Sequence, residues 1–386
     1  MSIIMYSMEF GDCFLIKNDD NNTGLLCDCG SNVKIDSAII QRIYNHIIKL
    51  DRAELLITHF HSDHTNKLDD LIKMHSNFGN SQNLFKKIYL PNIYFSDKID
   101  IEMIVFLFLY GQVTLAANVG TAFLKFLETL MKLNLCFLDI EFLHKGIPFT
   151  SSYRNITLWP LSNFTLFKKL KKNHYDTIKQ DFYTPEMTEQ IEQICTDLKE
   201  IIAGIRKFSK EGRKNEVEKN DYYYYLKHMT SMFFQKLNNV VKQINYTIKK
   251  GDELYKSIQR YADERANQNS LVFSDYEKEK YLMTGDVTTA NLKKIIKEHN
   301  LNKIRIIKAP HHGTFKCPHI LPDSDYIMIP YGKYSGGPKK IRSEYKTYNH
   351  DVCGSHIYCS NGNIKNGCDH QGATCGSCFI NCYTIL

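Results

Sequence analysis

The feature that most constrains this chain is a cluster of histidines and aspartates directly after a short apolar segment. Residues 53–58 read Ala-Glu-Leu-Leu-Ile-Thr, which is typical of a buried strand, and His59, His61, Asp63 and His64 follow them. A loop at the end of a strand holds such side chains rigidly and leaves one side open to solvent. His59 and His61 can converge on one metal ion, while Asp63 and His64 face a second. A polar surface loop is the alternative interpretation, and the density of ligands argues against it.

Two later segments also place ligand-type side chains after apolar, strand-like residues. Residues 282–285 lead to Asp286, where a carboxylate can bridge two cations, although a simple turn explains this step taken alone. Residues 304–307 precede a Lys-Ala-Pro step and then His311 and His312. One imidazole of this pair can bind the second metal, and the other can contact the substrate or donate a proton.

The rest of the pattern alternates between strands and helices. Residues 3–16 and 25–29 predict two strands joined by a polar turn, and residues 36–50 repeat apolar side chains with helical period. This order indicates an α/β layer structure. Residues 164–266 are rich in Lys, Glu, Gln and Tyr and keep helical spacing, so they predict a helical insertion. The basic and aromatic residues of that segment fit either a nucleic-acid surface or a solvated helix face.

An uncharged stretch and the overall charge bear on location and partners. Residues 103–124 carry no charge and are long enough to span a membrane, but their polar residues and glycines favour a buried helix pair. Residues 1–17 lack the pattern of a secretory signal peptide, so we expect a cytoplasmic protein that does not contact a membrane. The net charge of +7 suits an anionic substrate, and ordinary solubility explains it equally well.

The end of the chain is rich in cysteine. The chain has 12 cysteines, and the candidates for a structural zinc site near its end are Cys368, Cys375, Cys378 and Cys382. The two residues between Cys375 and Cys378 are the usual spacing of a zinc-ligand pair. Buried unpaired thiols or a reactive tail are the alternatives, and a reducing cytoplasm argues against disulfides.

Taken together, these motifs resemble the metallo-β-lactamase superfamily. Their order is most similar to the hydrolase domain of the bacterial competence protein that processes incoming DNA. Further segments that resemble this family are Gly11–Asp12–Cys13, residues 26–30, residues 156–160 and residues 269–273. The resemblance implies an αββα sandwich whose first half is residues 1–163 and whose second half is residues 267–366. The helical insertion, residues 164–266, separates the halves, and a Cys-rich tail, residues 367–386, follows them.

The resemblance also implies roles for the site residues. The first metal would be held by His59 and His61, and the second by Asp63, His64 and either His311 or His312. Asp286 would bridge the two metals, and Asp28 would lie beside them as an orienting carboxylate. Many family members carry one more metal-binding histidine, for which this chain offers no clear counterpart. At the place where the most similar relatives have a His–Pro step, the chain has Gly336–Gly337–Pro338.

This ligand set predicts a hydrolase. Two divalent cations lower the pKa of a bridging water, and nitrogen and oxygen ligands suit Zn²⁺ or Mn²⁺. The residues expected to act on the substrate are Asp63, His311 and His312. A phosphodiester, either a nucleotide or a nucleic acid, is the favoured substrate. A hydrolase of carboxylic esters, lactones or thioesters and a non-catalytic, metal-bound sensing or binding module are the alternatives. The sequence names no protein partner.

Overall fold

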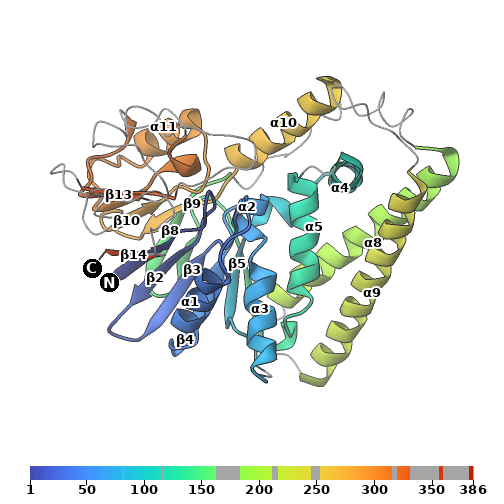
Figure 1. Ribbon diagram of the computed structural model, residues 1–386, viewed down its shortest axis with the longest axis horizontal. Helices are drawn as coiled ribbons and strands as arrows, with labels where there is room; N and C mark the ends of the chain where they lie inside the picture. The colour runs from blue at the N-terminus through green and yellow to red at the C-terminus, as the bar shows by residue number, and fades with distance from the viewer. Residues whose placement is uncertain are drawn as a thin grey trace.

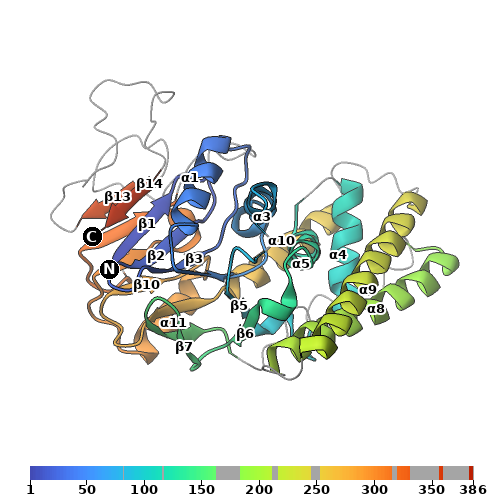
Figure 2. The ribbon, with the colours of Figure 1, turned by 90° about the horizontal axis from the view of Figure 1, so that it is seen from below.

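Two seven-stranded sheets pack face to face and carry helices on their outer faces (Figure 1). The computed structural model describes residues 1–80, 82–114, 117–161, 183–210, 216–244, 253–314, 320–330, 356–359 and 382–385. The predicted αββα sandwich is therefore confirmed. Figure 2 shows helices α1 (Ser37–Ile47) and α3 (Leu68–Asn77) on one side of the strands and α11 (Thr289–Glu298) on the other.

The first sheet joins an antiparallel and a parallel part. Its strands, in spatial order, are β14 (Cys382–Ile385), β1 (Ser2–Tyr6), β2 (Phe14–Asn18), β3 (Thr23–Cys27), β4 (Arg52–Leu56), β5 (Lys87–Pro91) and β6 (Asp139–Leu143). Strands β1 to β3 pair antiparallel, and β3 to β6 pair parallel. The single strand predicted for residues 3–16 is wrong: Glu9 and Phe10 adopt positive φ, which breaks the strand and forms a loop before β2.

The second sheet supplies the other half of the sandwich. Its strands, in spatial order, are β13 (His356–Cys359), β12 (Tyr326–Ile329), β11 (Ile306–Lys308), β10 (Tyr281–Met283), β9 (Val272–Asp275), β8 (Arg154–Trp159) and β7 (Pro148–Thr150). Strands β10, β11 and β12 run parallel. The carboxyl ends of β10 and β11 therefore meet at one edge of the sheet.

Three apolar clusters correspond to the three interfaces between these four layers. Ile39, Ile43 and Ile47 recur at helical spacing on α1 and pack onto the first sheet. Side chains such as Phe14 and Phe273 fill the space between the sheets. A third cluster joins α11 to the outer face of the second sheet. Burial of these faces is the main driving force for the sandwich.

The uncharged stretch of residues 103–124 forms the buried helix pair expected from its sequence. It comprises α4 (Ile101–Thr114) and most of α5 (Val119–Leu130). Asn118 begins α5: its side chain accepts from the Thr121 amide at 3.0 Å and donates to the Leu107 carbonyl at 2.8 Å. Within the described ranges, none of the helices is long and apolar enough to cross a membrane.

The described residues of the segment predicted as an insertion, residues 164–266, are mostly helical. Its helices are α8 (Pro185–Lys210), α9 (Glu216–Gln243) and α10 (Glu253–Gln268). Helices α8 and α9 form a long antiparallel pair at the side of the sandwich, whereas α10 leads back to β9 (Figure 1). The boundaries drawn at residues 163 and 266 stay a prediction.

The segment predicted as a Cys-rich tail contributes to the first sheet. Strand β14 pairs antiparallel with β1, so that Ile3 lies opposite Ile385. Cys368, Cys375 and Cys378 lie outside the described residues, as do residues 336–338. Cys382 begins β14. A structural zinc in this segment therefore stays a prediction.

Candidate metal centre

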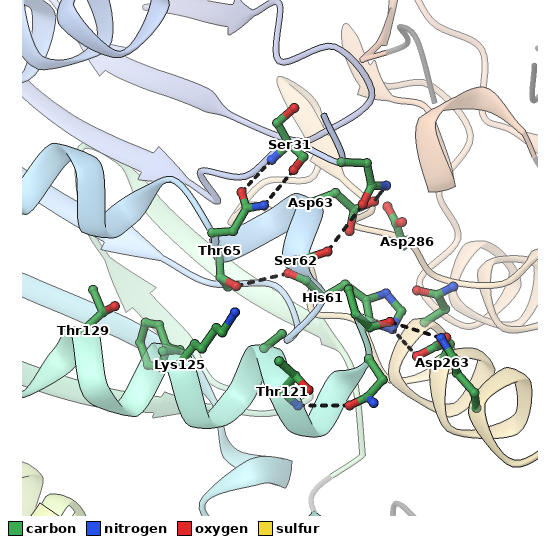
Figure 3. A pocket seen from close by; sticks show the side chains of 18 of the residues that line it. Ser31, His61, Ser62, Asp63, Thr65, Thr121, Lys125, Thr129, Asp263 and Asp286 are labelled. Atoms are coloured by element: carbon green, nitrogen blue, oxygen red, sulfur yellow. Dashed lines mark hydrogen bonds and ion pairs between the residues drawn. The ribbon is translucent and has the colours of Figure 1, made fainter. Parts of the chain in front are cut away.

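The histidine and aspartate motifs of both sheets meet at the floor of one cavity. The cavity has a volume of about 1100 Å³, and His61, Asp63, Asp286 and His311 are among the residues that line it. Helix α5 forms another wall, and residues 259–267 of α10 also line the cavity (Figure 3). Sites of this kind, where strand ends and loops border a concave surface, are where substrates bind in most enzymes.

Close backbone contacts fix the first histidine motif, which follows β4. The short helix α2 (Ser62–Thr65) belongs to this motif, and two loops of the first sheet hold it: the Asp12 amide donates to the Asp63 carbonyl at 2.9 Å, and the Cys29 amide to the His64 carbonyl at 2.7 Å. A Cβ atom at Gly30 would lie 2.3 Å from the carbonyl carbon of Asp63. Glycine is therefore required at position 30.

Several residues around the site adopt the left-handed backbone conformation. Asp28 has a φ of 57°, His311 of 48° and His312 of 54°. Non-glycine residues rarely adopt such angles, because each costs on the order of 1–3 kcal/mol and persists only where the surrounding structure imposes it. At η4 (Pro310–Gly313) this geometry points His312 into the protein core and leaves His311 at the cavity.

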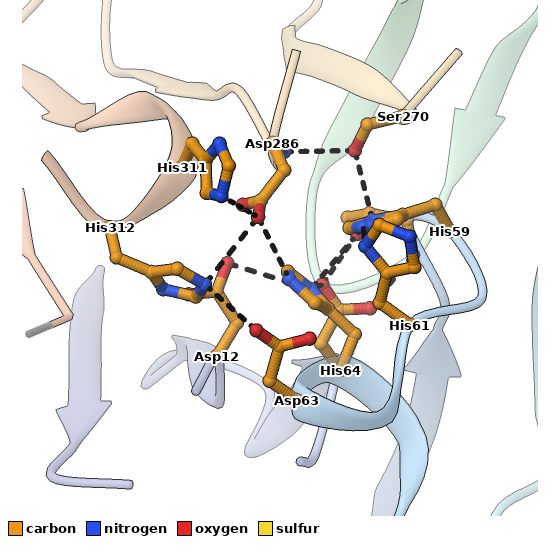
Figure 4. Close-up of polar contacts among 12 residues, drawn as sticks. Asp12, His59, His61, Asp63, His64, Ser270, Asp286, His311 and His312 are labelled. Atoms are coloured by element: carbon orange, nitrogen blue, oxygen red, sulfur yellow. Dashed lines mark hydrogen bonds and ion pairs between the residues drawn. The ribbon is translucent and has the colours of Figure 1, made fainter. Parts of the chain in front are cut away.

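Four buried side chains form what we call the inner cluster: Asp63, His64, Asp286 and His312 (Figure 4). Asp286 Oδ2 lies 3.4 Å from both His64 Nε2 and His312 Nε2, and His312 Nε2 lies 3.3 Å from Asp63 Oδ2. Among the described residues, neither Nε2 atom makes a hydrogen bond of good geometry. Ligand atoms around a tetrahedral zinc ion are separated by about 3.3 Å, because each lies about 2.0–2.1 Å from the metal. The inner cluster therefore fits a metal ion.

The other two motif histidines form a second group, the outer pair, which comprises His59 and His61. His59 Nε2 lies 3.0 Å from His61 Nδ1. His59 is fully buried, whereas the side chain of His61 is 15% exposed and borders the cavity. Two imidazole nitrogens that face each other at this distance can share a metal ion.

Each of these histidines also has a second nitrogen that faces a protein oxygen. His64 Nδ1 lies 2.8 Å from Asp28 Oδ2, and His312 Nδ1 lies 3.1 Å from Asp12 Oδ1. In the outer pair, His59 Nδ1 lies 3.1 Å from Thr58 Oγ1 and 3.2 Å from Ser270 Oγ, and His61 Nε2 lies 3.5 Å from Asp263 Oδ1. Such partners fix the tautomer of a metal-binding histidine, so that its remaining nitrogen is free to bind metal.

Asp28 is itself held firmly. Its carboxylate accepts from the Thr58 amide at 2.8 Å and from the Thr58 hydroxyl at 2.6 Å. Asp28 thus lies beside the site, where the resemblance places it. Its contact with His64 connects the end of β3 to the motif after β4.

The two groups differ in their electrostatics. Burial lowers the pKa of His312, but the charges of Asp286 and Asp12 outweigh it and raise that pKa to about 9. His64 is likewise buried among carboxylates, which raise its pKa well above the usual range. Burial lowers the pKa of His59 strongly, and the neighbouring His64 and His61 lower it further. Without metal, the inner histidines therefore bind protons at neutral pH, whereas His59 is neutral.

A buried lysine, for which the sequence predicts no role, lies against the inner cluster. Lys308 Nζ lies 2.5 Å from Asp12 Oδ2 and 3.1 Å from Asp286 Oδ1, and it donates to the Gly285 carbonyl at 2.7 Å. It is 1% exposed. Because Lys308 holds one oxygen of Asp286, the other oxygen, Oδ2, faces the two histidines.

The structure distinguishes between the two histidines of the later motif. His312 belongs to the inner cluster, whereas His311 Nε2 lies 3.9 Å from Asp286 Oδ2 and borders the cavity. Asp12 has no predicted role, although Gly11–Asp12–Cys13 is visible in the sequence. One potential ligand atom from each of Asp12, His64, Asp286 and His312 lies within 4.8 Å of the others. We assign Asp12 to orienting His312, because it faces Nδ1 and pairs with Lys308.

Comparison with known proteins adds little to this geometry. No protein-family model matches the chain, and no curated protein matches it. Among solved structures, it is similar to the metallo-beta-lactamase fold protein YhfI from Bacillus subtilis, with 16% identity and a TM-score of 0.24. The match covers 40% of this chain and 52% of that protein, so the chain spans about half the length of the protein that it matches.

Proposed function

We propose that this protein is a metal-dependent hydrolase of the metallo-β-lactamase type with two divalent cations, one at the inner cluster and one at the outer pair. The orientation of His59, His61, His64 and His312 carries the proposal. Each has one nitrogen on a protein oxygen, and the other nitrogens fall into two groups. A set of histidines that served only packing would have no reason to share this arrangement.

The residues present suit the chemistry of such a site. Bound divalent cations lower the pKa of a water molecule to near 7 and polarise the substrate. Asp286 belongs to the inner cluster, and its backbone amide donates at 3.0 Å to Ser270 Oγ, the hydroxyl that faces His59 of the outer pair. Asp63 accepts from Asn32 Nδ2 at 2.8 Å, which fixes its carboxylate at the cavity floor. His311 borders the cavity and is placed to contact the substrate or its leaving group.

We propose Zn²⁺ or Mn²⁺ as the metal, because the ligands of both groups are imidazole nitrogens and carboxylate oxygens. A phosphodiester of a nucleotide or nucleic acid is the proposed substrate. Lys125 and Arg260 support this choice: both are exposed, and both line the cavity. In Figure 3 the Lys125 side chain extends along the wall formed by α5. The positive charges of Lys125 on α5 and Arg260 on α10 suit an anionic substrate.

The test combines metal content with activity. The purified chain should contain close to two equivalents of transition metal by elemental analysis. Loaded with Zn²⁺ or Mn²⁺, it should hydrolyse bis(p-nitrophenyl) phosphate or single-stranded DNA, lose activity with a chelator and regain it with metal. Hydrolysis of p-nitrophenyl acetate alone would show that the substrate class is wrong. A folded protein that takes up no metal would show that the hydrolase proposal itself is wrong.

A further inference from the structure

The helical insertion reaches the metal centre through one side chain of α10. We propose that Asp263 is a positioning residue for the outer pair, which it supports by holding His61 in the orientation that binds metal. The proposal rests on the function proposed above, because it assigns the insertion a role in that same site.

The contact between the two side chains is specific. Asp263 Oδ1 lies 3.5 Å from His61 Nε2, and His61 Nδ1, on the other side of the ring, lies 3.0 Å from His59 Nε2. Figure 3 shows Asp263 approaching His61 from α10. Both facing atoms, His61 Nε2 and Asp263 Oδ1, are buried, and neither makes a hydrogen bond within the described residues, so the ion-pair contact between them is the polar contact that the structure gives to each.

The chain directly after Asp263 supports the second histidine of the pair. Ser270 Oγ lies 3.2 Å from His59 Nδ1 and accepts from the Asp286 amide at 3.0 Å. The stretch from Asp263 to Ser270 thus contacts the outer side of both histidines. In the inner cluster, Asp28 and Asp12 play the equivalent part from loops of the first sheet.

The end of α10 is anchored well enough to hold a side chain in place. The Gln268 carbonyl accepts from Trp159 Nε1 at 2.7 Å and from Asn291 Nδ2 at 2.8 Å. The Leu271 amide donates to the Thr58 carbonyl at 2.8 Å, immediately before His59. These bonds tie the exit of the insertion to the strand that carries the first motif.

The chemistry follows from the two nitrogens of His61. When Nε2–H donates to a carboxylate, Nδ1 is left without a proton and its lone pair faces His59 Nε2. The carboxylate also makes the imidazole a more basic ligand. Without Asp263, the ring can rotate or carry its proton on Nδ1. Loss of such a partner typically weakens metal binding by about 10–100-fold.

The experiment titrates the metal-free full chain with Zn²⁺ against a competing chelator dye. Asp263→Ala should lower the affinity for one of the two zinc equivalents by about 10–100-fold and leave the affinity for the other unchanged. Asp263→Asn keeps an oxygen that can accept from His61, so it should recover part of the affinity. Glu264→Gln is the matched control, because Glu264 follows on the same helix and lines the same cavity. It should bind both equivalents as the wild type does.

Further variants separate positioning from a general effect of charge or folding. If Asp263 acts through His61, then Asp263→Ala should add nothing in a His61→Ala background. Wild-type affinity for both zinc equivalents in Asp263→Ala would overturn the inference, as would equal losses in Asp263→Ala and Glu264→Gln. Should the alanine variant fail to fold, unchanged zinc affinities in both Asp263→Asn and Asp263→Glu would overturn it as well. A wild-type chain that binds no zinc would instead reject the proposed function.

Discussion

The aspartates that orient His64 and His312 of the inner cluster stand in loops of the first sheet, close to strand ends that the fold requires anyway. In the outer pair, His59 faces Thr58 and Ser270, whereas His61 relies on Asp263, which belongs to a helix outside the sandwich. The inner cluster is also buried, and the buried Lys308 pairs with one of its carboxylates, Asp286. The residues that support the inner cluster belong to the sandwich itself, whereas one that supports the outer pair belongs to the insertion. We therefore expect the inner cluster to bind its metal ion more tightly than the outer pair.

The largest effect is expected from Asp63, at the boundary between the inner cluster and the cavity. Asp63→Ala should lower kcat by a factor on the order of 10³ or more, because it would remove a ligand of the metal ion that supplies the attacking hydroxide and stabilises the transition state. Substrate affinity should change by less than about tenfold. Steady-state kinetics on a phosphodiester measures both.

Asp70→Ala is the control for Asp63, because Asp70 is an exposed carboxylate on the following helix, α3. It should behave as the wild type does. Equal rates in all three proteins would mean that the inner cluster takes no part in hydrolysis.

Replacement of the buried Lys308 tests how much its positive charge stabilises the carboxylates beside it. Lys308→Met removes the ammonium group that pairs with both Asp12 and Asp286 and leaves only the protonated histidines to offset these buried charges, so the metal-free protein should lose about 3–5 kcal/mol of unfolding free energy. Urea unfolding of the chelated protein measures this loss, which added Zn²⁺ should partly restore. Lys73→Met, which breaks an exposed pair with Asp69, should leave the unfolding free energy close to that of the wild type. Similar losses of unfolding free energy in Lys308→Met and Lys73→Met would contradict the view that the inner cluster depends on a buried positive charge.

Stepwise removal of metal tests the ranking of the two positions directly. The outer pair offers two imidazole nitrogens, whereas the inner cluster offers two imidazoles and two carboxylates, so we expect the outer pair to release zinc first as the chelator concentration rises. An affinity gap of about 100-fold corresponds to about 2.7 kcal/mol. His59→Ala should abolish the weaker step, and His64→Ala the stronger one. The reverse assignment would refute the order of affinities that we infer.

The smallest effect concerns the pH dependence of the metal-free protein. His312 has an ordinary pKa of 6.5 and a folded-state pKa of about 9, so its contribution to stability is complete below about pH 6.5 and is lost as the pH rises through 9. His64, whose pKa is also raised, acts in the same direction. The pKa of His59 is lowered, so its contribution falls as the pH drops below 6.5.

Thermal unfolding in chelator between pH 5 and 10 checks these signs. The melting temperature should fall by a few degrees toward pH 9, and Zn²⁺ should remove this fall, because its ligands must be deprotonated. His312→Gln should flatten the alkaline side of the profile. An alkaline limb that is identical in the wild type and in this variant would argue against the pKa assigned to His312.

Much of the site could be predicted because its ligands directly follow strands. His59, His61, Asp63 and His64 are neighbours in the sequence, and the end of β4 brings them together. The choice between His311 and His312 could not be made from the sequence, since both follow the same strand. Only the left-handed backbone at these positions decides which ring turns inward.

The supporting residues were harder to foresee than the ligands. Asp263 lies on a helix whose sequence pattern indicates only that the helix is amphipathic. The role of Asp263 depends on where that helix packs against the sandwich. Asp12 follows a glycine in a segment that reads as part of a longer strand, and Lys308 reads as an ordinary polar residue before a turn. A contact between distant segments leaves no periodic signal in either of them.

The pairing of β14 with β1 places the last described residues beside the first, and Figure 1 shows the two termini together. Strand β13 likewise lies at the edge of the second sheet, next to β12. A protein shortened before Cys353 to remove cysteines would lose both strands. The backbone groups of β1 and β12 would then be open to pairing with other molecules, which is a route to aggregation. Serine replacements of individual cysteines preserve both sheet edges and are the safer way to study the thiols.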